Sequence, residues 1–214
     1  MISRELKKRI VTSVVLIAIV LNCLFINKYS WLFLLAIISL ICWFEFINLS
    51  KKIWKKKIII IIPITASFLI LFIFLRTAYD IRVNFGEETI LFILLVCVFS
   101  DIGGYVVGKS IGGKKLTKIS PNKTISGSIG SFLFSLFPAG IFSVFFPSVT
   151  EKDIFLCLIL SLACQFGDLV ISYFKRLAKV KDTGDILPGH GGMLDRIDGI
   201  IFAVPTLLIF NHLI

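Results

Sequence analysis

Residues 58–75 read IIIIIPITASFLILFIFL, a run without a single charged side chain. As an α-helix at about 1.5 Å per residue, the run would be about 27 Å long, close to the thickness of a bilayer's hydrocarbon core. Lysines precede the run and Arg76 follows it, so charge marks both of its ends. The run therefore predicts a helix that crosses a membrane.

Similar stretches lie on both sides of this run. The chain has seven candidate spans, at residues 10–26, 31–49, 58–75, 89–108, 125–146, 154–174 and 195–214. Of its 214 residues, 57% are hydrophobic and 17% are charged, whereas soluble domains have about 45–50% and about 25%. This composition excludes a soluble enzyme, a disordered chain and a secreted disulfide scaffold. We expect an all-α fold, a polytopic integral membrane helical bundle of about seven transmembrane helices.

The seven predicted spans differ in polarity between the two halves of the chain. The first three are plain apolar runs apart from Glu45, whereas the last four carry acids, glycines and hydroxyl residues. Because a carboxylate at membrane depth is costly unless it faces a cavity or a partner, the second half should line the functional site. We therefore expect a three-helix scaffold at residues 1–88 and a catalytic membrane region of four helices with cytoplasmic loops at residues 89–214.

Basic residues alternate along the chain in a way that predicts its orientation. Residues 4–9, 50–57, 109–124 and 175–194 hold eighteen of the 23 Lys and Arg residues. By the positive-inside rule, these segments and the N-terminus lie in the cytoplasm and the C-terminus lies outside. The formal net charge of +10 is thus more typical of cytoplasmic loops than of nucleic-acid binding. For residues 51–57 we assign the charge to topology, with some attraction to lipid head groups, whereas topology alone does not account for residues 109–124 and 175–194.

Residues 100–127, SDIGGYVVGKSIGGKKLTKISPNKTISG, form the first polar loop with its flanks. Glycine lets a backbone approach a phosphate closely, and lysine adds positive charge. Ser120-Pro121 followed by Lys123-Thr124 predicts a turn into a helix whose N-terminus favours an anion. Ser100, Asp101, Lys123 and Thr124 are therefore candidate substrate-binding residues; the alternative is a flexible basic loop.

Residues 165–198, QFGDLVISYFKRLAKVKDTGDILPGHGGMLDRID, form the second polar loop with its flanks. Asp195 and Asp198 are three residues apart on a predicted helix, so both project from one face. With Asp168 they form a candidate ligand set for Mg²⁺, which binds carboxylate oxygens together with substrate phosphates. The alternative is that Asp168 pairs with a lysine and that the other two acids cap a helix.

Two further polar residues, His190 and Glu45, each allow more than one role. His190 lies in Pro188-Gly189-His190-Gly191-Gly192, where it fits a phosphate contact or a general acid or base, or else a structural role. Glu45 lies deep in the second predicted span, where it is either functional, paired in a structural role, or close to the interface.

The second loop resembles the signature of the phosphatidate cytidylyltransferases, also called CDP-diacylglycerol synthases. The residues that carry the resemblance are Ser172, Lys175-Arg176, Lys181-Asp182, Gly184 and the run from Leu187 to Asp198, LPGHGGMLDRID. Gly167-Asp168, Ser100-Asp101, Gly103, Tyr105, Gly108, Ser120-Pro121 and Lys123-Thr124 match upstream. The chain departs from the pattern at Lys109, Ser126 and Gly199, and residues 108–120 are a shorter stretch than usual.

This resemblance implies that CTP and phosphatidate react to give CDP-diacylglycerol and diphosphate, with Mg²⁺ and a monovalent cation such as K⁺. It implies that the metal is held by Asp168, Asp195 and Asp198, and that Gly189, Gly191 and Gly192 bind substrate. The implied catalytic residues are Lys175, Arg176, His190, Asp195, Arg196 and Asp198. It also implies a homodimer in the lipid bilayer of the bacterial cytoplasmic membrane, with the active site on the cytoplasmic side.

Two other classes remain as alternatives. One is another membrane lipid-phosphate transferase, such as a cytidylyltransferase for a different lipid phosphate, or a lipid kinase. The other is an ion-coupled transporter with intramembrane acids as ion ligands. The acids gather toward one predicted side of the membrane beside phosphate-type loops, and the two halves show no inverted repeat, which disfavours a transporter.

Overall fold

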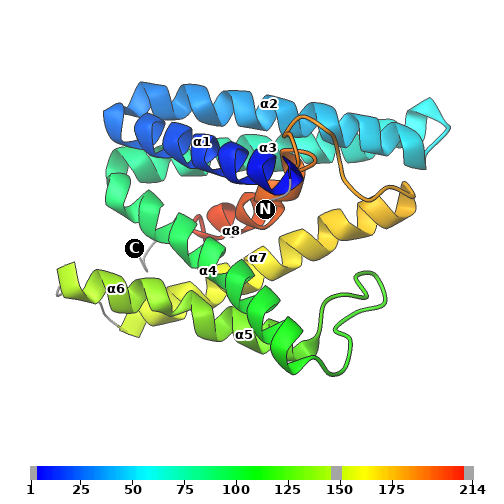
Figure 1. Ribbon diagram of the computed structural model, residues 1–214. Helices are drawn as coiled ribbons and strands as arrows, with labels where there is room; N and C mark the ends of the chain where they lie inside the picture. The colour runs from blue at the N-terminus through cyan, green and yellow to red at the C-terminus, as the bar shows by residue number, and fades with distance from the viewer. Residues whose placement is uncertain (1–3, 146–150, 210–214) are drawn as a thin grey trace. The chain divides into compact units, whose positions relative to one another are not determined.

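The computed structural model describes residues 4–145 and 151–209, and within these ranges it is helical without a β-strand (Figure 1). The helices are α1 (Arg4–Ile26), α2 (Lys28–Ile53), α3 (Lys57–Asn84), α4 (Glu87–Ile111), α5 (Ile125–Ser135), α6 (Phe137–Phe145), α7 (Glu151–Leu177) and α8 (Leu194–Thr206). The expected all-α class is confirmed.

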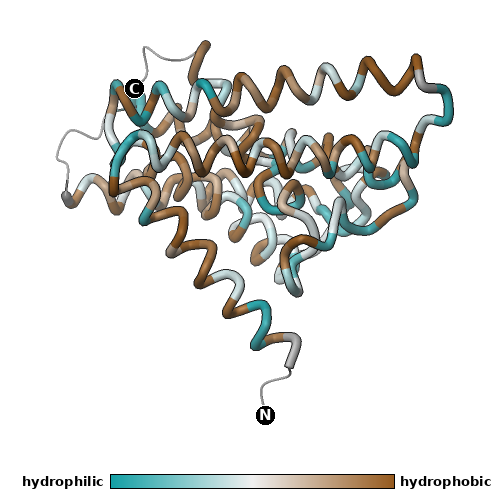
Figure 2. The backbone as a smooth tube through the Cα atoms, turned by 90° about the horizontal axis from the view of Figure 1, so that it is seen from above, coloured by the Kyte–Doolittle hydropathy of each residue, from teal (hydrophilic) through white to brown (hydrophobic). Residues whose placement is uncertain are grey.

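Six segments of the described chain are long and apolar enough to cross a membrane. They are Leu6–Ile26, Lys28–Ile53, Ile58–Asn84, Glu87–Ile111, Ile125–Val144 and Glu151–Leu177. They correspond to the first six predicted spans, and the chain is a polytopic integral membrane protein. Figure 2 shows apolar residues filling the long helices and hydrophilic residues in the links between them.

The seventh predicted span, 195–214, differs from the prediction in its described part. Helix α8 has only 13 residues, about 20 Å, which is too short to cross the hydrocarbon core. Its apolar residues are instead used for packing, since Ile201, Ala203 and Val204 are buried. Turn residues follow Thr206, and residues 210–214 lie outside the described part of the chain.

The fifth predicted span is divided into α5 and α6. Leu136 separates the two helices, and its N–H donates to the carbonyls of Leu133 and Phe134. Pro138 follows two residues later; it has no N–H and its ring crowds the preceding turn, so a continuous helix is interrupted there. The last predicted residue of this span, 146, lies outside the described residues.

The chain forms two compact units, which are described separately. Unit 1 comprises residues 1–83 with 174–197, and unit 2 comprises residues 84–173 with 198–214. The compact units thus divide the sequence differently from the functional division expected at residue 88, which stays a prediction.

Unit 1 contains α1, α2 and α3 with the end of α7, the following loop and the start of α8. Asn27 alone links α1 to α2; its side chain accepts hydrogen bonds from the N–H groups of Tyr29 and Ser30 and so begins α2. Trp31 donates from Nε1 to the carbonyl of Ala78, 3.2 Å away, which ties α2 to α3. These contacts make the first three helices a scaffold for the loop.

The end of α7 is anchored to α2 by aromatic side chains. The ring of Phe174 packs edge-on against Phe46, with 5.1 Å between centroids, and against Trp54, with 6.2 Å. Such edge-to-face contacts add to the energy of burial. The loop that follows α7 therefore starts from a fixed point on α2.

Unit 2 is organised by close contact between α4 and α5. A Cβ placed on Gly130 would lie 2.7 Å from the carbonyl oxygen of Gly103, and one on Gly127 would lie 2.8 Å from that of Gly104. Small residues spaced in this way let two backbones touch, which is a common basis of helix packing in membranes. Helix α7 joins them through a buried hydrogen bond of 2.8 Å between the hydroxyls of Ser100 and Ser161.

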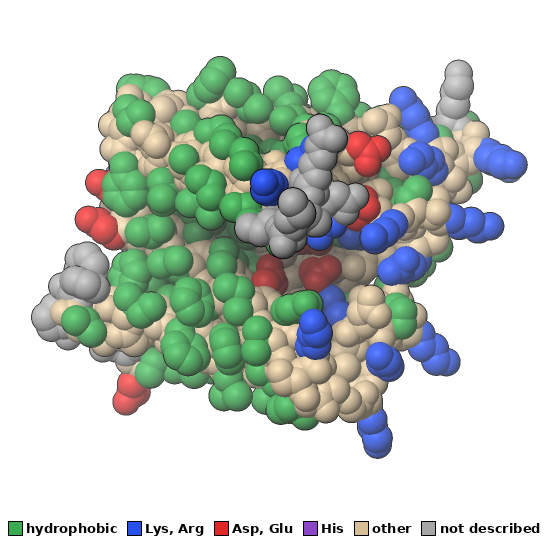
Figure 3. Space-filling model, in the orientation of Figure 1, with side chains coloured by type: hydrophobic (Ala, Val, Ile, Leu, Met, Phe, Trp, Pro, Cys, Tyr) green, Lys and Arg blue, Asp and Glu red, His purple; other side chains and the backbone are tan. Residues whose placement is uncertain are grey.

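Apolar and basic side chains occupy different parts of the surface (Figure 3). Exposed apolar side chains lie along the long helices, for example Val14 and Ile17 on α1 and Ile58 and Ile62 on α3. In each unit, Lys and Arg side chains gather at a link between helices: between α2 and α3 in unit 1, and between α4 and α5 in unit 2. The apolar sides suit contact with lipid tails, and the basic links suit a head-group region.

Candidate active site

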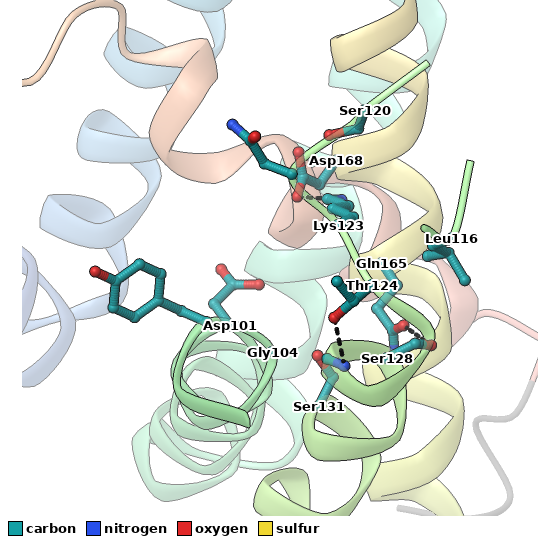
Figure 4. A pocket seen from close by; sticks show the side chains of 13 residues that line it. Asp101, Gly104, Leu116, Ser120, Lys123, Thr124, Ser128, Ser131, Gln165 and Asp168 are labelled. Atoms are coloured by element: carbon teal, nitrogen blue, oxygen red, sulfur yellow. Dashed lines mark hydrogen bonds and ion pairs between the residues drawn. The ribbon is translucent and has the colours of Figure 1, made fainter. Parts of the chain in front are cut away.

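A pocket of about 360 Å³ in unit 2, here called the α4–α5 pocket, holds several of the predicted substrate residues (Figure 4). Helix α4 provides Asp101, Gly104 and Tyr105, the loop and the first turns of α5 provide Leu116, Ser120, Asn122, Lys123, Thr124, Gly127, Ser128 and Ser131, and α7 provides Gln165 and Asp168. The sequence prediction placed Asp101, Lys123 and Thr124 together, and the structure does the same. It adds Gln165 and Ser128, whose side chains are hydrogen-bonded to each other.

The position of Lys123 follows from how the preceding loop folds back. The Leu116 N–H donates to the Lys123 carbonyl at 2.9 Å, and the Ile125 N–H donates to the Lys114 carbonyl at 3.0 Å. Thr124 then begins α5 as its N-cap, with its hydroxyl accepting from the Gly127 N–H at 3.1 Å. These hydrogen bonds hold the two ends of the loop close together.

Lys123 forms an ion pair with Asp168 on the pocket wall (Figure 4). The Ser172 hydroxyl also donates to Asp168 at 3.2 Å. Both charged side chains keep access to solvent, 25% for Lys123 and 35% for Asp168. The alternative that Asp168 pairs with a lysine therefore holds in this structure, and a phosphate or cation entering the pocket would meet both charges.

Ser100 lies away from this pocket. Its side chain is fully buried and bonded to Ser161, whereas Asp101 next to it lines the pocket. A helix turns by about 100° per residue, so neighbours face different directions. Ser100 is placed to hold α4 against α7, and its predicted contact with substrate gains no support from the geometry.

A second pocket, of about 560 Å³, lies in unit 1 and is here called the PGHGG pocket. It is lined by Arg9, Lys181, Asp182, Asp185, Leu187, Pro188, Gly189, His190, Gly191 and Arg196. The charges are mixed, with cations from α1, from the loop and from α8. Such a polar hollow suits a ligand that itself carries phosphate groups and a counter-ion.

The PGHGG pocket is shaped by a tight turn. The His190 N–H donates to the Leu187 carbonyl at 2.9 Å, with Pro188 and Gly189 between them and φ of +77° at Gly189. Proline followed by a residue with positive φ is the pattern of a type II turn, which glycine adopts without strain. The Leu187 N–H donates in turn to the Gly191 carbonyl at 2.9 Å, which closes the loop on itself.

His190 is held from two sides. Its Nε2 lies 3.1 Å from the hydroxyl of Ser13 on α1, and its carbonyl accepts two hydrogen bonds from Arg196, the shorter at 2.7 Å. Its Nδ1 is buried and has no hydrogen-bond partner among the described residues. Both the ring and the Arg196 guanidinium are thereby fixed beside the pocket.

Lys175 and Asp195 form a partly buried ion pair at 2.7 Å in unit 1. The other oxygen of Asp195 accepts from the Thr183 N–H at 2.7 Å and from the Gly192 N–H at 3.2 Å, and it lies 2.9 Å from the Thr183 hydroxyl. Burial raises the pKa of Asp195, but these hydrogen bonds and the lysine charge outweigh it and hold the pKa below its usual value. Asp195 is therefore an ionised carboxylate that organises the loop around it.

The remaining predicted residues, Arg176, Asp198 and Gly192, do not line either pocket. Arg176 is exposed and lines neither pocket. Asp198 is buried on α8, where it accepts from the Gly199 N–H at 2.9 Å. Gly192 does not line the PGHGG pocket, because it is pressed against Thr183 and Glu45.

The three candidate metal ligands do not form a ready metal centre within one unit. Asp195 belongs to unit 1, whereas Asp168 and Asp198 belong to unit 2. Within the described residues of either unit, no three His, Cys, Asp or Glu side chains form a group that could hold a metal ion. The metal assignment stays a prediction.

Sequence reasoning left the role of Glu45 open and missed Arg9 and Ser13. Glu45, whose role was open, is 3% exposed and accepts hydrogen bonds from the loop that carries Asp195. Its isolation as an acid in an apolar span was the available signal. Arg9 and Ser13 gave no signal, because α1 is distinguished in sequence only by its apolar residues and basic start.

With this geometry in place, comparison with known proteins identifies the family. The family model described as "Cytidylyltransferase family" matches residues 56–214. The chain belongs to the cytidylyltransferase family. The matched residues include all those that line the α4–α5 pocket, and all those of the PGHGG pocket except Arg9. The family expected from the sequence is confirmed.

Two curated relatives of the chain come from bacteria. The phosphatidate cytidylyltransferase of Bacillus subtilis (strain 168) is 43% identical over 130 residues, which cover 58% of this chain and 48% of the relative. That of Staphylococcus aureus (strain COL) is 47% identical over 125 residues, which cover 57% of this chain and 48% of the relative. The chain thus matches about half the length of these relatives.

Proposed function

We propose that this member of the cytidylyltransferase family is a phosphatidate cytidylyltransferase, which makes CDP-diacylglycerol from CTP and phosphatidate. The observation that carries the proposal is the PGHGG turn, which lines a polar pocket together with Arg196 and is followed along the chain by Asp195, the ion-pair partner of Lys175. The names of the bacterial relatives specify the same reaction for those proteins. The six candidate spans would embed the protein in the bilayer, where a lipid substrate resides.

In the proposed reaction, an oxygen of the phosphatidate phosphate attacks the α-phosphorus of CTP. A new P–O bond forms, the bond between the α-phosphorus and the bridging oxygen breaks, and diphosphate leaves with the electron pair. Phosphatidate is already ionised at neutral pH, so no side chain needs to remove a proton. The protein's task is to hold two anions together and to neutralise the charge that builds on the leaving group.

The described residues suit this task. Arg196, fixed by two hydrogen bonds to the His190 carbonyl, and Lys181 and Arg9 bring positive charge to the PGHGG pocket. Lys123 brings positive charge to the α4–α5 pocket. We infer that these cations bind phosphate oxygens, and that Lys175 acts mainly by keeping Asp195 ionised and in place.

We further propose that Mg²⁺ is the cofactor, with a monovalent cation such as K⁺ beside it. Carboxylates are the ligands Mg²⁺ prefers, and Asp168 is partly exposed on a pocket wall, which fits such a role. Asp195 fits less directly, because the side chains and backbone around it already use both of its oxygens. When bound, Mg²⁺ would screen the triphosphate; Asp168 and Asp198 are the residues proposed to hold it, with Asp195.

The proposed reaction also implies where the enzyme lies in the cell. We propose that it lies in the bacterial cytoplasmic membrane with the N-terminus and both pockets toward the cytoplasm, where CTP is found. The basic links between helices support this orientation. We also propose a homodimer, which cross-linking in native membranes would test.

A transfer assay tests the reaction. Purified full-length protein in lipid nanodiscs is incubated with labelled CTP and phosphatidate, with Mg²⁺ or with EDTA, and labelled lipid is measured. We expect labelled CDP-diacylglycerol only with Mg²⁺, and a strong loss in Asp168→Asn and Asp198→Asn. Asp80→Asn is the matched control for Asp168→Asn, because the Asp80 side chain is 34% exposed, close to the 35% of Asp168, and also forms an ion pair, with Arg76.

Other outcomes would point elsewhere. Transfer to a different lipid phosphate with none to phosphatidate would make the protein another lipid-phosphate transferase. Ion flux into vesicles without nucleotide turnover would favour a transporter. Equal activity in the Asp168 and Asp198 variants and in the Asp80 control would overturn the metal assignment alone.

A further inference from the structure

Glu45 is a buried acid of unit 1 to which the proposed reaction gives no role. It lies on α2 with 3% of its surface exposed. Its two oxygens accept hydrogen bonds from the N–H groups of Met193 and Leu194, both at 2.9 Å, and one oxygen lies 2.9 Å from the hydroxyl of Thr183. A buried carboxylate needs such partners to offset the loss of water.

The first contact of Glu45 is with the start of α8. The first N–H groups of a helix have no partner within the helix, and a negative charge there interacts favourably with the helix dipole. Leu194 is the first residue of α8 and Met193 precedes it. Glu45 therefore caps α8 from another helix, 148 residues away in sequence from Met193. This contact fixes where α8 begins, and Asp195 is its second residue.

The second contact of Glu45 passes through Thr183. The Thr183 hydroxyl lies 2.9 Å from an oxygen of Glu45 and 2.9 Å from an oxygen of Asp195. A hydroxyl has one proton, so it donates to one of the two carboxylates at a time. Thr183 thereby connects Glu45 to Asp195, which in turn is paired with Lys175.

Two glycines of the signature give Glu45 the space for these contacts. A Cβ on Gly184 would lie 2.7 Å from one Glu45 oxygen, and a Cβ on Gly192 would lie 2.6 Å from the other. A side chain at either position would push the carboxylate away. The loop is therefore shaped around Glu45 as well as around Asp195.

We propose that Glu45 is a positioning residue of the active site: with Thr183, it sets the start of α8 and so the orientation of Asp195 and Arg196. It acts through these residues and does not touch substrate. This inference rests on the proposed function for its kinetic part only, because the contacts themselves are independent of the reaction.

The test compares Glu45→Gln, Thr183→Val and Thr183→Ser with Ser39→Ala, a control at another buried polar position on α2. Glu45→Gln keeps the shape but turns an amide NH₂ toward a backbone N–H. We expect kcat to fall roughly 10–100-fold in Glu45→Gln and Thr183→Val, as for other residues that orient a site. KM for CTP should change by less than about threefold, and Thr183→Ser, which keeps the hydroxyl, should restore most of kcat.

A second measurement does not need turnover. Hydrogen exchange followed by mass spectrometry reports on the backbone amides of Met193 and Leu194. These amides should exchange faster in Glu45→Gln than in wild type, and at the wild-type rate in Ser39→Ala. Unchanged exchange in Glu45→Gln, or wild-type kcat in both Glu45→Gln and Thr183→Val, would overturn the inference. So would equal losses in Thr183→Ser and Thr183→Val. If the wild type itself transfers no cytidylyl group, the proposed function fails, while the exchange experiment still decides the role of Glu45.

Discussion

At the scale of single residues, the partly buried ion pair of Lys175 and Asp195 predicts how the stability of the protein changes at low pH. The pKa of Asp195 is lowered from 3.8, so the ionised form is favoured by folding. Its contribution to stability is complete above the pKa of the unfolded chain and is lost as the pH falls through the lower folded value.

The melting temperature of wild type minus that of Asp195→Asn should therefore be constant from neutral pH down to about 4. Below that the difference should shrink. Scanning fluorimetry in detergent over this range measures it. A difference that disappears near neutral pH would contradict the assignment of Asp195 as an ionised partner.

Lys123 makes a second prediction at this scale. Lys123→Ala should lower kcat/KM for CTP by roughly 10²–10³, the usual cost of removing a group that stabilises developing charge. Lys118→Ala removes the same charge from the same loop at an exposed position that lines neither pocket. The assay is CTP turnover in nanodiscs at a fixed phosphatidate concentration. Equal losses in the two variants would show that Lys123 contributes only the general positive charge of the loop and has no specific role in the pocket.

At the scale of elements, the contact between α4 and α5 requires small residues, because the two backbones touch. Gly103→Ala would drive a methyl group into the Gly130 carbonyl and the Phe134 ring, and overpacking of this kind costs about 1–3 kcal/mol. Gly140→Ala on α6 has no neighbour within 4 Å of the added Cβ. We expect a clear fall in melting temperature for the first variant and none for the second, measured on purified protein.

Elements also show which parts of the site a sequence can predict. The Pro188-Gly189 turn and the Thr124 N-cap depend on neighbouring residues, so local rules identify both. The contacts of Ser13 with His190 and of Glu45 with the start of α8 join residues that are far apart in sequence. Helix periodicity gives the face of each residue but not its partner, and for that reason these contacts could not be predicted.

At the scale of the whole molecule, the fold class was predictable because length and hydropathy alone determine which segments can cross a bilayer. The exception is α8, where apolar residues serve packing against other helices rather than lipid contact. Hydropathy cannot distinguish the two uses, since both remove the same side chains from water. The proposed metal ligands raise the same difficulty, because carboxylates that bind metal ions and carboxylates that pair with lysine share one sequence pattern.

Orientation in the membrane gives the last prediction. With the N-terminus in the cytoplasm, six crossings place the links after α2, α4 and α7 inside and the link after α3 outside. In a chain freed of its five native cysteines, Phe85→Cys should react with an impermeant maleimide on intact cells. Lys118→Cys should react only after permeabilisation. The reverse pattern would place both pockets outside, away from cytoplasmic CTP, and would contradict the proposed reaction together with the topology.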